Sequence, residues 1–426
     1  MASAGGLSEE GRGRLVVQVV PAGRSWTAEW AELVTTTGLD LFAGPEWFVP
    51  WEKAFAPGRL HYVLATRGGR LVGLLPVVPD GRTLRSATNS ETVRYSPVLV
   101  EPALVVDIVK ALPSRWRRIS LAYLPAHELP PTLEAYGSSR GVRIISREIR
   151  RSPTLPTVGD FRKWESERLS AHRRKNLRRL RRRLSELGEV RLEVSDGSAQ
   201  LQDLMEEGFA LEASGWKGAA GGAVLSRPAA HRFYMDLTAW ASSVGALRLF
   251  QLRVDGRSIA FALNIERGGV VSGLKLAYDE CYQSYSPGVL LNQSALEYCF
   301  AASGIRRFDF LGEAERHKTE WTDDSEVQLQ VELFAPGTRS MLEMAAVRCL
   351  WGIRESMRRR VPLEVRERID TSSPRRAVRS AAVVVRTRLS RSSTPTRGVR
   401  ASAIFRLPLR RRPDEPPPGK PQPGPG

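Results

Sequence analysis

The chain has 426 residues, 42% of them hydrophobic and 8% aromatic, which is enough for two domains with packed cores. Its three cysteines lie far apart without a CxxC pair and its five histidines show no metal-ligand spacing, so the composition excludes a disulfide framework and predicts no metal. The formal charge of +18 is concentrated in residues 162–183, with net +9, and residues 358–426, with net +13, which leaves −4 elsewhere.

The first half of the chain is predicted to be a mixed α/β unit over residues 14–155, after a disordered N-terminus over residues 1–13. A strand is expected at residues 15–20, and Ser25 is a candidate N-cap for the helix that follows. Residues 60–66 and 70–78, joined by a Gly-Gly turn, predict a β-hairpin. Shorter strands are expected near residues 98–100 and 118–123.

A basic helix is predicted near the boundary between the two halves. Leu177, Leu180, Leu184 and Leu187 recur at helical intervals, and Gly188 marks the end of the helix. The opposite face is nearly all arginine, which fits either a solvated surface or contact with an anionic partner such as a nucleic acid or a membrane surface. Aromatic residues are not interleaved with the arginines, which argues against specific binding of single-stranded nucleic acid.

A second hairpin, predicted at residues 247–254 and 257–265, resembles the first. We infer from this similarity two related α/β halves in tandem, the second spanning residues 156–336. When the first hairpin is aligned with the second, Arg70 falls on Arg257, Gly73 on Ala260, Leu74 on Phe261 and Gly81 on Gly268.

Residues 270–321 carry the strongest functional signal. They predict a strand, a polar loop, a helix capped by Ser286 with Pro287 at its first position, and a second strand. The second strand is expected to lie parallel to the first, which places a ligand region at the carboxyl ends of both strands. Amide groups at the helix start suit an anion, although a strand–helix–strand unit with nothing bound fits the same pattern.

The C-terminal part is predicted to contain a helical segment over residues 337–370 and a disordered Arg/Pro-rich tail over residues 371–426. The helix at residues 338–360 has an apolar face that is expected to pack on the body. No apolar run approaches the ~20 residues that span a bilayer, and no export signal is visible, so we expect a cytoplasmic protein without a transmembrane segment. The apolar face of the helix at residues 338–360 consists of Met341, Leu342, Ala345, Cys349, Leu350, Ile353 and Met357.

Four stretches together resemble the CelD/BcsL-type acetyltransferases of the GNAT superfamily, which are similar to Fem-type peptidyltransferases. The resemblance covers roughly residues 15–335 and implies two GNAT-like halves and an acyltransferase, often linked to polysaccharide or cell-envelope metabolism. The stretches are A-H-R-R-K-N-L-R-R-L-R-R-R-L-S-E-L-G at 171–188, L-E-A-S-G-W-K-G at 211–218, S-Y-S-P-G-V-L-L at 284–291 and F-D-F-L-G-E-A-E-R-H-K-T-E-W at 308–321.

The resemblance implies acetyl-CoA or another acyl-CoA as the donor. In GNAT proteins a central strand pairs with the pantetheine arm, and loop amides at the next helix start hold the pyrophosphate. The usual G-x-G/A phosphate loop is absent here, as it generally is in this family. The residues of this chain that correspond to the donor-binding strand and loop of GNAT proteins are Leu276, Tyr278, Ser284, Ser286, Pro287 and Gly288.

Acyl transfer requires a base for the proton of the acceptor. We expect Asp309, within the second strand, and Glu313, at its carboxyl end, to be catalytic, with a structural ion pair as the alternative role for Asp309. Core packing is the alternative role for Trp216, and a surface position the alternative for Lys318. The residues predicted to contact the acceptor are Glu212, Trp216, Lys217, Asp279 and Lys318.

The sequence therefore predicts an acyltransferase that acts on an amino or hydroxyl group of a small molecule or saccharide. One alternative is a Fem-like aminoacyl-tRNA-dependent transferase whose basic helix holds RNA. That helix is shorter than the long helical arm of many Fem-type enzymes, which counts against this alternative. The other alternative is a non-catalytic GNAT-like scaffold that binds an acidic partner.

Overall fold

The computed structural model describes residues 13–128 and 131–360. The predictions for the N-terminal segment up to residue 12 and for the tail after residue 370 lie outside these residues. The chain divides into two compact units, Met1–Val347 and Arg348–Gly426. Among the described residues, no helix is both long and apolar enough to cross a membrane.

The first half is built on a hairpin that the sequence predicts closely. The expected strands at residues 60–66 and 70–78 are β2 (His61–Arg67) and β3 (Arg70–Asp80), and the two pair antiparallel. The remaining elements of this half are β1 (Leu15–Pro21), α1 (Thr27–Thr37), α2 (Pro45–Phe55), β4 (Thr83–Ser86), β5 (Val98–Leu99), α3 (Leu104–Lys110), β6 (Arg118–Pro125), α4 (Thr132–Ser139) and β7 (Arg143–Pro156), with short 3₁₀ turns η2 (Arg24–Trp26), η3 (Leu41–Ala43) and η4 (Ala126–Glu128).

The second half repeats this strand order. Its hairpin is β9 (Leu247–Val254) and β10 (Arg257–Arg267), which continues through a Gly-Gly turn into β11 (Val270–Tyr278). The other elements are α5 (Phe161–Arg168), α6 (Ala171–Ser185), β8 (Val190–Ser195), α7 (Leu201–Ser214), α8 (Trp216–Ala219), η5 (Val224–Ser226), α9 (Pro228–Ser243), η6 (Glu280–Tyr285), α10 (Pro287–Ala301), β12 (Arg307–Asp309), α11 (Arg316–Thr319), β13 (Ser325–Phe334) and α12 (Thr338–Arg360).

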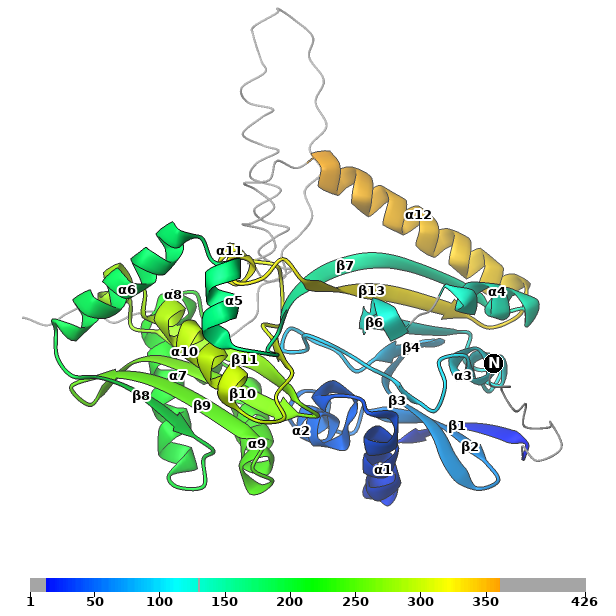
Figure 1. The fold of residues 1–426 in the computed structure, drawn as a ribbon. Helices are drawn as coiled ribbons and strands as arrows, with labels where there is room; N and C mark the ends of the chain where they lie inside the picture. The colour runs from blue at the N-terminus through cyan, green and yellow to red at the C-terminus, as the bar shows by residue number, and fades with distance from the viewer. Residues whose placement is uncertain (1–12, 129–130, 361–426) are drawn as a thin grey trace, which may run out of the picture. The chain divides into compact units, whose positions relative to one another are not determined.

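All strands belong to one mixed sheet, in which the last strands of the two halves are exchanged (Figure 1). The sheet order is β1-β2-β3-β4-β6-β13-β7-β12-β11-β10-β9-β8, with β5 beside β3. In each half an antiparallel meander ends in a parallel pair, β4 with β6 and β11 with β12. The next position beside β6 is taken by β13 from the second half, and that beside β12 by β7 from the first. The predicted class, α/β with two tandem halves, is confirmed.

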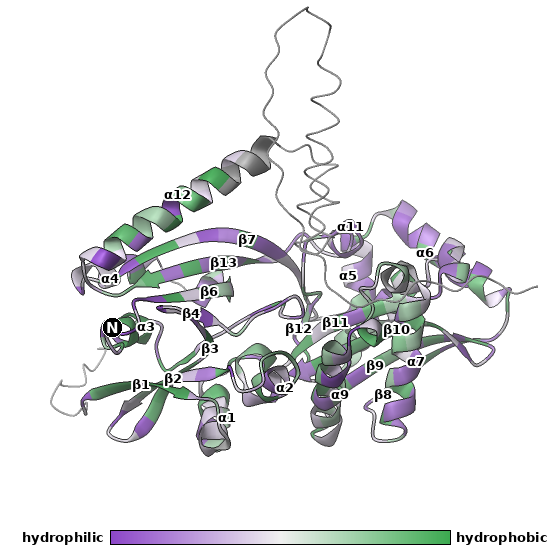
Figure 2. Cartoon of the chain, turned by 180° about the vertical axis from the view of Figure 1, so that it is seen from behind, coloured by the Kyte–Doolittle hydropathy of each residue, from purple (hydrophilic) through white to green (hydrophobic). Residues whose placement is uncertain are grey.

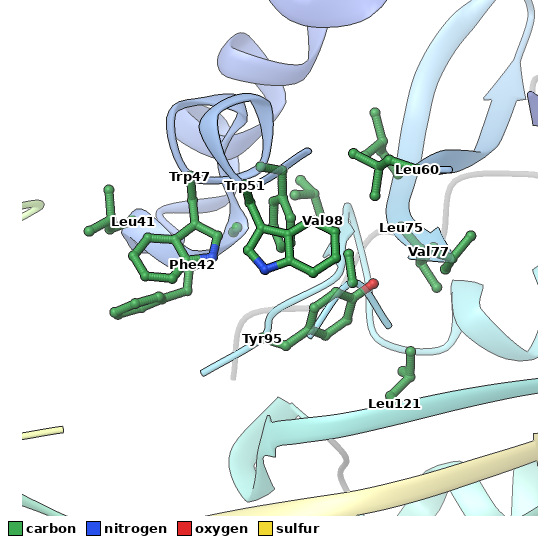
Figure 3. Packing of buried hydrophobic residues seen from close by; sticks show 14 of the residues in the cluster. Leu41, Phe42, Trp47, Trp51, Leu60, Leu75, Val77, Tyr95, Val98 and Leu121 are labelled. Atoms are coloured by element: carbon green, nitrogen blue, oxygen red, sulfur yellow. The ribbon is translucent and has the colours of Figure 1, made fainter. Parts of the chain in front are cut away.

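Helices cover both faces of the second half of the sheet. Alternate residues of a strand point to opposite faces, and on β10 Phe261 and Leu263 pack with α7 and α9, whereas Ala260 and Ala262 pack with α10. The core on the α7/α9 face continues into the first half through α2, where the Trp47 and Phe233 rings lie 4.9 Å apart. Figure 3 shows Trp47, Trp51 and Tyr95 gathered in this core.

Three local expectations about helices need correction. The basic segment forms two helices, α5 and α6, which are separated by Leu169, the C-cap of α5, and Ser170, the N-cap of α6. The helix α6 ends at Ser185, with Glu186 as its C-cap, and so does not reach Gly188. Ser25 lies within a 3₁₀ turn, and Trp26 takes the N-cap position of α1. The bounds of α12 match the prediction, but its predicted apolar face is largely exposed and not packed as expected: Met341 is 51%, Leu342 72%, Leu350 55% and Ile353 50% exposed.

Candidate functional site

The strands β11 and β12 pair over only three residues and then part. Val270, Val271 and Ser272 face Arg307, Phe308 and Asp309 in parallel register, whereas β11 stays paired with β10 as far as Tyr278. A bulge leaves Leu274 without a partner on β10 just beyond the last parallel pair, and bulges bend the strand that carries them. Beyond Ser272, β12 no longer pairs with the backbone edge of β11, and an extended ligand could take its place.

The start of α10 lies against this free part of β11. A Cβ atom added to Gly288 would lie 3.3 Å from Cδ1 of Tyr278 and 3.8 Å from Cδ2 of Leu276, so a larger residue here would require the Tyr278 ring to shift by a few tenths of an ångström. Pro287 and Gly288 are buried, whereas Ser284 is exposed. The structure thus brings together the residues predicted to hold the donor: the strand positions and the helix start.

Ser286 takes the N-cap position of α10, with Pro287 at the start of the helix, as the sequence predicts, but its side chain does not cap the helix. Its backbone adopts the left-handed conformation, with φ of 51°, and its side chain accepts no hydrogen bond from the helix. Its carbonyl oxygen instead accepts from the amides of Val289 and Leu290, at 3.0 and 3.2 Å. A left-handed serine is strained relative to glycine, and such strain often marks a turn with a functional role.

Asp309 and Lys318 together hold a strained turn at the end of β12. The Asp309 carboxylate accepts from the Leu311 amide at 2.9 Å, and the Lys318 ammonium donates to the Leu311 carbonyl at 2.9 Å. Leu311 has φ of 52°, a conformation that leucine rarely adopts, and Gly312 follows with φ of 70°. The turn presents Glu313, whose side chain is 63% exposed and accepts from Nε of Arg150 at 3.0 Å.

Asp309 also belongs to a buried ion cluster around Arg94. The guanidinium contacts carboxylates of Asp40 at 2.9 Å, Glu326 at 2.6 Å and Asp309 at 3.5 Å. Burial raises the pKa of Asp309 to about 6, although the Arg94 charge opposes that shift. Asp309 thus makes the kind of structural ion pair named above as its alternative role, and its catalytic role stays a prediction. Glu313 is the carboxylate that remains accessible.

Asp279 and Glu212, predicted on the acceptor side, both hold backbone turns. Asp279 is buried, caps η6 through the Cys281 amide at 2.9 Å, and pairs with Arg257 at 2.6 Å. The Glu212 carboxylate accepts from the Val224 amide at 2.8 Å. The side chains of Trp216 and Lys217 lie outside what the structure describes, so their predicted roles stay predictions.

The face of β11 opposite α10 carries a charged cluster that sequence reasoning missed. Buried Glu91 pairs with Lys275 of β11 at 3.2 Å and with Arg227, and the Tyr234 hydroxyl donates to it at 3.0 Å. Burial opposes ionisation of Glu91, but Lys275 and Arg227 hold its pKa below the usual range. The signal available in the sequence was Lys275 itself, a charge inside the otherwise apolar strand V-V-S-G-L-K-L-A-Y.

The basic helix α6 lies next to the loop before α10. Leu177, Leu180 and Leu184 are buried as predicted, whereas Leu187 lies beyond the helix and is exposed. The guanidinium of Arg183 lies 5.0 Å over the ring of Tyr285, the last residue of η6. Figure 2 shows α6 as a largely hydrophilic helix. The exposed basic side chains are Lys175, Arg178, Arg179, Arg181 and Arg182.

Comparison with known proteins identifies the domain that contains this site. Residues 171–319 match the family model described as an acetyltransferase (GNAT) domain, a span that includes α6, the split strands and the Glu313 turn. No curated protein sequence matches the chain well enough to count as a relative.

Solved structures with the same fold include FemX, which is 11% identical and covers 76% of this chain and 99% of its own, with a TM-score of 0.51. A conserved protein of unknown function from Bacteroides thetaiotaomicron VPI-5482 is 9% identical, covers 74% of this chain and 100% of its own, and has the same TM-score. At these identities the likeness shows the fold, which is GNAT-like in two halves.

Proposed function

We propose that the chain is an acyltransferase that moves an acetyl or other acyl group from acyl-CoA to an amino or hydroxyl acceptor. The observation that carries the proposal is the free edge of β11 beside the start of α10, within the segment that matches a GNAT domain. An amide-containing pantetheine arm can pair with such an edge as an added strand, and the helix start favours phosphate. The narrower resemblance to CelD/BcsL-type enzymes, and a saccharide acceptor, are part of this proposal.

In the proposed reaction the acceptor nitrogen or oxygen attacks the thioester carbonyl. The new C–N or C–O bond forms and the C–S bond breaks, the proton of the acceptor passes to Glu313, and the departing CoA thiolate takes up that proton from Glu313, directly or through water, which regenerates the carboxylate. Glu313 is exposed at the carboxyl end of β12, and Arg150 fixes one oxygen of its carboxylate. Asp309 and Lys318 would contribute by holding the Leu311 turn that presents Glu313.

The donor site is tested by calorimetric titration of acetyl-CoA into the full chain and two variants. Gly288→Asp places a carboxylate and a Cβ between the helix start and Tyr278, and we expect at least about a tenfold loss of affinity because like charges repel at the phosphate position. Ala301→Asp adds the same charge at the exposed far end of α10 and should bind normally. Failure of the unaltered chain to bind, or equal binding by both variants, would reject the donor assignment.

A Fem-like aminoacyl-tRNA-dependent transferase is the second candidate, favoured by the exposed basic face of α6. It predicts tRNA binding that weakens steeply with salt, since phosphate contacts release counterions. Replacing Arg178, Arg179 and Arg182 by Ala should then lower affinity and reduce the slope against salt by roughly one unit per contact. Tight acetyl-CoA binding with salt-independent, weak tRNA binding would exclude this candidate.

A further inference from the structure

The first half contains a cavity of about 440 Å³ at the end of β4, far along the sheet from the candidate site. Trp51 and Phe55 of α2 form an aromatic wall, and Ser86 and Ser120 come from the parallel strands β4 and β6. This volume lies within the range of small-molecule sites.

The internal repeat shows that this cavity occupies the position equivalent to the split strands of the second half. With Arg70 superposed on Arg257, the bulged residues of the two hairpins also coincide, Val72 on Ile259. The same superposition places the first residues of the parallel strands on each other, Thr83 on Val270.

Counting from these first residues, each parallel ladder has three pairs and then ends, at Arg85 in the first half and at Ser272 in the second. The cavity residues Arg85 to Asn89 therefore correspond to Ser272 to Leu276, the stretch where β11 leaves β12. The fold thus opens at the same point in each half.

The lining of the cavity is cationic and rich in hydrogen-bonding groups. Arg85 pairs with Asp80 at 2.7 Å. The exposed guanidinium of Arg59 forms no ion pair within 4 Å among the described residues, although its charge also acts on the Asp80 carboxylate. The lining contains no carboxylate. An anionic group is therefore the natural complement of this surface.

Neutral polar groups surround this cation. Trp51 is only 3% exposed, so it offers the cavity the face of its ring and not its indole Nε1, which is itself buried. Thr88, Asn89 and Gln330 add a hydroxyl and two amides, of which the Gln330 Nε2 already donates to Ser120 and Glu332, so its Oε1 is the group left for a ligand. Hydroxyl groups of a ligand would match these donors and acceptors.

A second CoA does not suit this site as well as it suits the second half. The helix that follows β4 in the first half, α3, has only seven residues, carries Asp107 in its first turn and has no side-chain cap. An acid at a helix start disfavours phosphate, in contrast to α10, which has none there.

We propose that this cavity is a binding site for a hydroxylated anion of the sugar-acid or sugar-phosphate class. Arg59 pairs with the carboxylate or phosphate, the neutral polar side chains of the lining bind hydroxyl oxygens, and the Trp51–Phe55 wall contacts the apolar ring face. The site lies outside the matched GNAT segment, and the proposal does not depend on acyl transfer.

The test is equilibrium titration of the full chain, by ligand-observed NMR, with glucuronate, glucose 6-phosphate, glucose and acetyl-CoA. The two anionic sugars should bind, and the stronger of them identifies the source of the charge. Neutral glucose should bind at least about tenfold more weakly, the loss of one charge-assisted contact.

Two variants and a control place the ligand in the cavity. Arg59→Gln should weaken the anionic sugars about tenfold and leave acetyl-CoA affinity unchanged. Ala122→Leu, which adds bulk to the cavity lining, should abolish sugar binding, with the fold checked by circular dichroism. Arg82→Gln removes an exposed arginine of the same half that does not line the cavity and should have no effect.

The proposal is overturned if neither anionic sugar binds the unaltered chain at about 10 mM, an affinity typical of weak sites. It is also overturned if Arg59→Gln and Arg82→Gln behave alike, or if acetyl-CoA competes with the sugars. Loss of acetyl-CoA binding by Gly288→Asp with normal sugar binding would show that the two sites are separate.

Discussion

The candidate site depends on a few residues whose backbone conformations are unusual. Ser286 and Leu311 both have positive φ, and they lie at the loops leaving β11 and β12. Hydrogen bonds hold each strained turn, and they offset the conformational free-energy cost of its positive φ. The roles of individual residues at these turns can be separated by conservative substitutions.

Glu313→Gln should lower kcat for acyl transfer by about 10²–10⁴-fold if Glu313 takes the proton of the acceptor. Acetyl-CoA affinity should not change, because this carboxylate lies on the acceptor side of the proposed reaction. The measurement is thiol release from acetyl-CoA with a panel of amino and hydroxyl compounds, together with calorimetry. Glu297→Gln, at a partly exposed position on α10, is the matched control, and equal rates for the two variants would remove Glu313 from the mechanism.

The ion cluster around Arg94 makes stability depend on pH through Glu128. Burial raises the pKa of Glu128 from 4.5 to about 8, although the Ser96 hydroxyl donates to its carboxylate at 2.5 Å. Because the folded chain holds this proton more tightly than the unfolded chain, the contribution favours folding at low pH and is lost as pH rises from about 4.5 to about 8.

Glu128→Gln should therefore reduce the fall in unfolding free energy between pH 5.5 and pH 7.5, by up to about 1.4 kcal/mol for each pH unit. Urea titrations at the two pH values measure the difference. Glu134→Gln, on the exposed face of α4, should keep the behaviour of the unaltered chain. A steeper fall in the Glu128 variant would contradict the sign of the shift.

At the scale of elements, local sequence signals predicted hairpins and the strand–loop–helix unit well. The turns of the two predicted hairpins contain Gly68-Gly69 and Gly256, which have positive φ that glycine adopts freely, so both hairpins could be predicted from the sequence. The helix α2 was missed, since Pro50 lies within it and usually ends a helix. The break of the basic segment at Ser170 depends on a cap that competes with a continuous helical pattern.

The contact between α7 and β10 is close enough to be sensitive to one methyl group. A Cβ atom on Gly208 would lie 2.5 Å from the buried ring of Phe261, so Gly208→Ala should destabilise the fold by about 1–3 kcal/mol. Denaturant titration measures this loss, and adding Phe261→Leu should recover part of it. Gly352→Ala, on an open face of α12, should cause no such loss, and a stable Gly208 variant would show that α7 moves freely.

At the scale of the molecule, pairing between distant segments was not predictable from local patterns. The two halves could be inferred from the similar hairpins, but nothing in β7 or β13 indicates that each completes the other half. The Arg94 cluster has the same origin, because Asp40, Asp309 and Glu326 are brought together only by the sheet order. The site positions on β11 and α10 were predictable because they are close in sequence.

The exchange of strands predicts that the first half cannot fold alone. A fragment of residues 13–156 lacks β13, which lies between β6 and β7, and would leave both strands with unpaired edges. It should give a poorly dispersed NMR spectrum and no cooperative unfolding, whereas residues 13–347 should unfold in one transition. A well-dispersed spectrum from the shorter fragment would show that β6 and β7 do not need β13.

The same exchange sets an order for events on the ribosome. The nascent chain exposes β6 when Pro125 has emerged, but the partner strand is complete only at Phe334. At typical elongation rates the intervening stretch takes on the order of 10–40 s to synthesise, a time in which one hydrogen-bonding edge stays open to water, chaperones or other chains. Slow codons placed before residue 334 should therefore lower the yield of native protein more than slow codons placed after it.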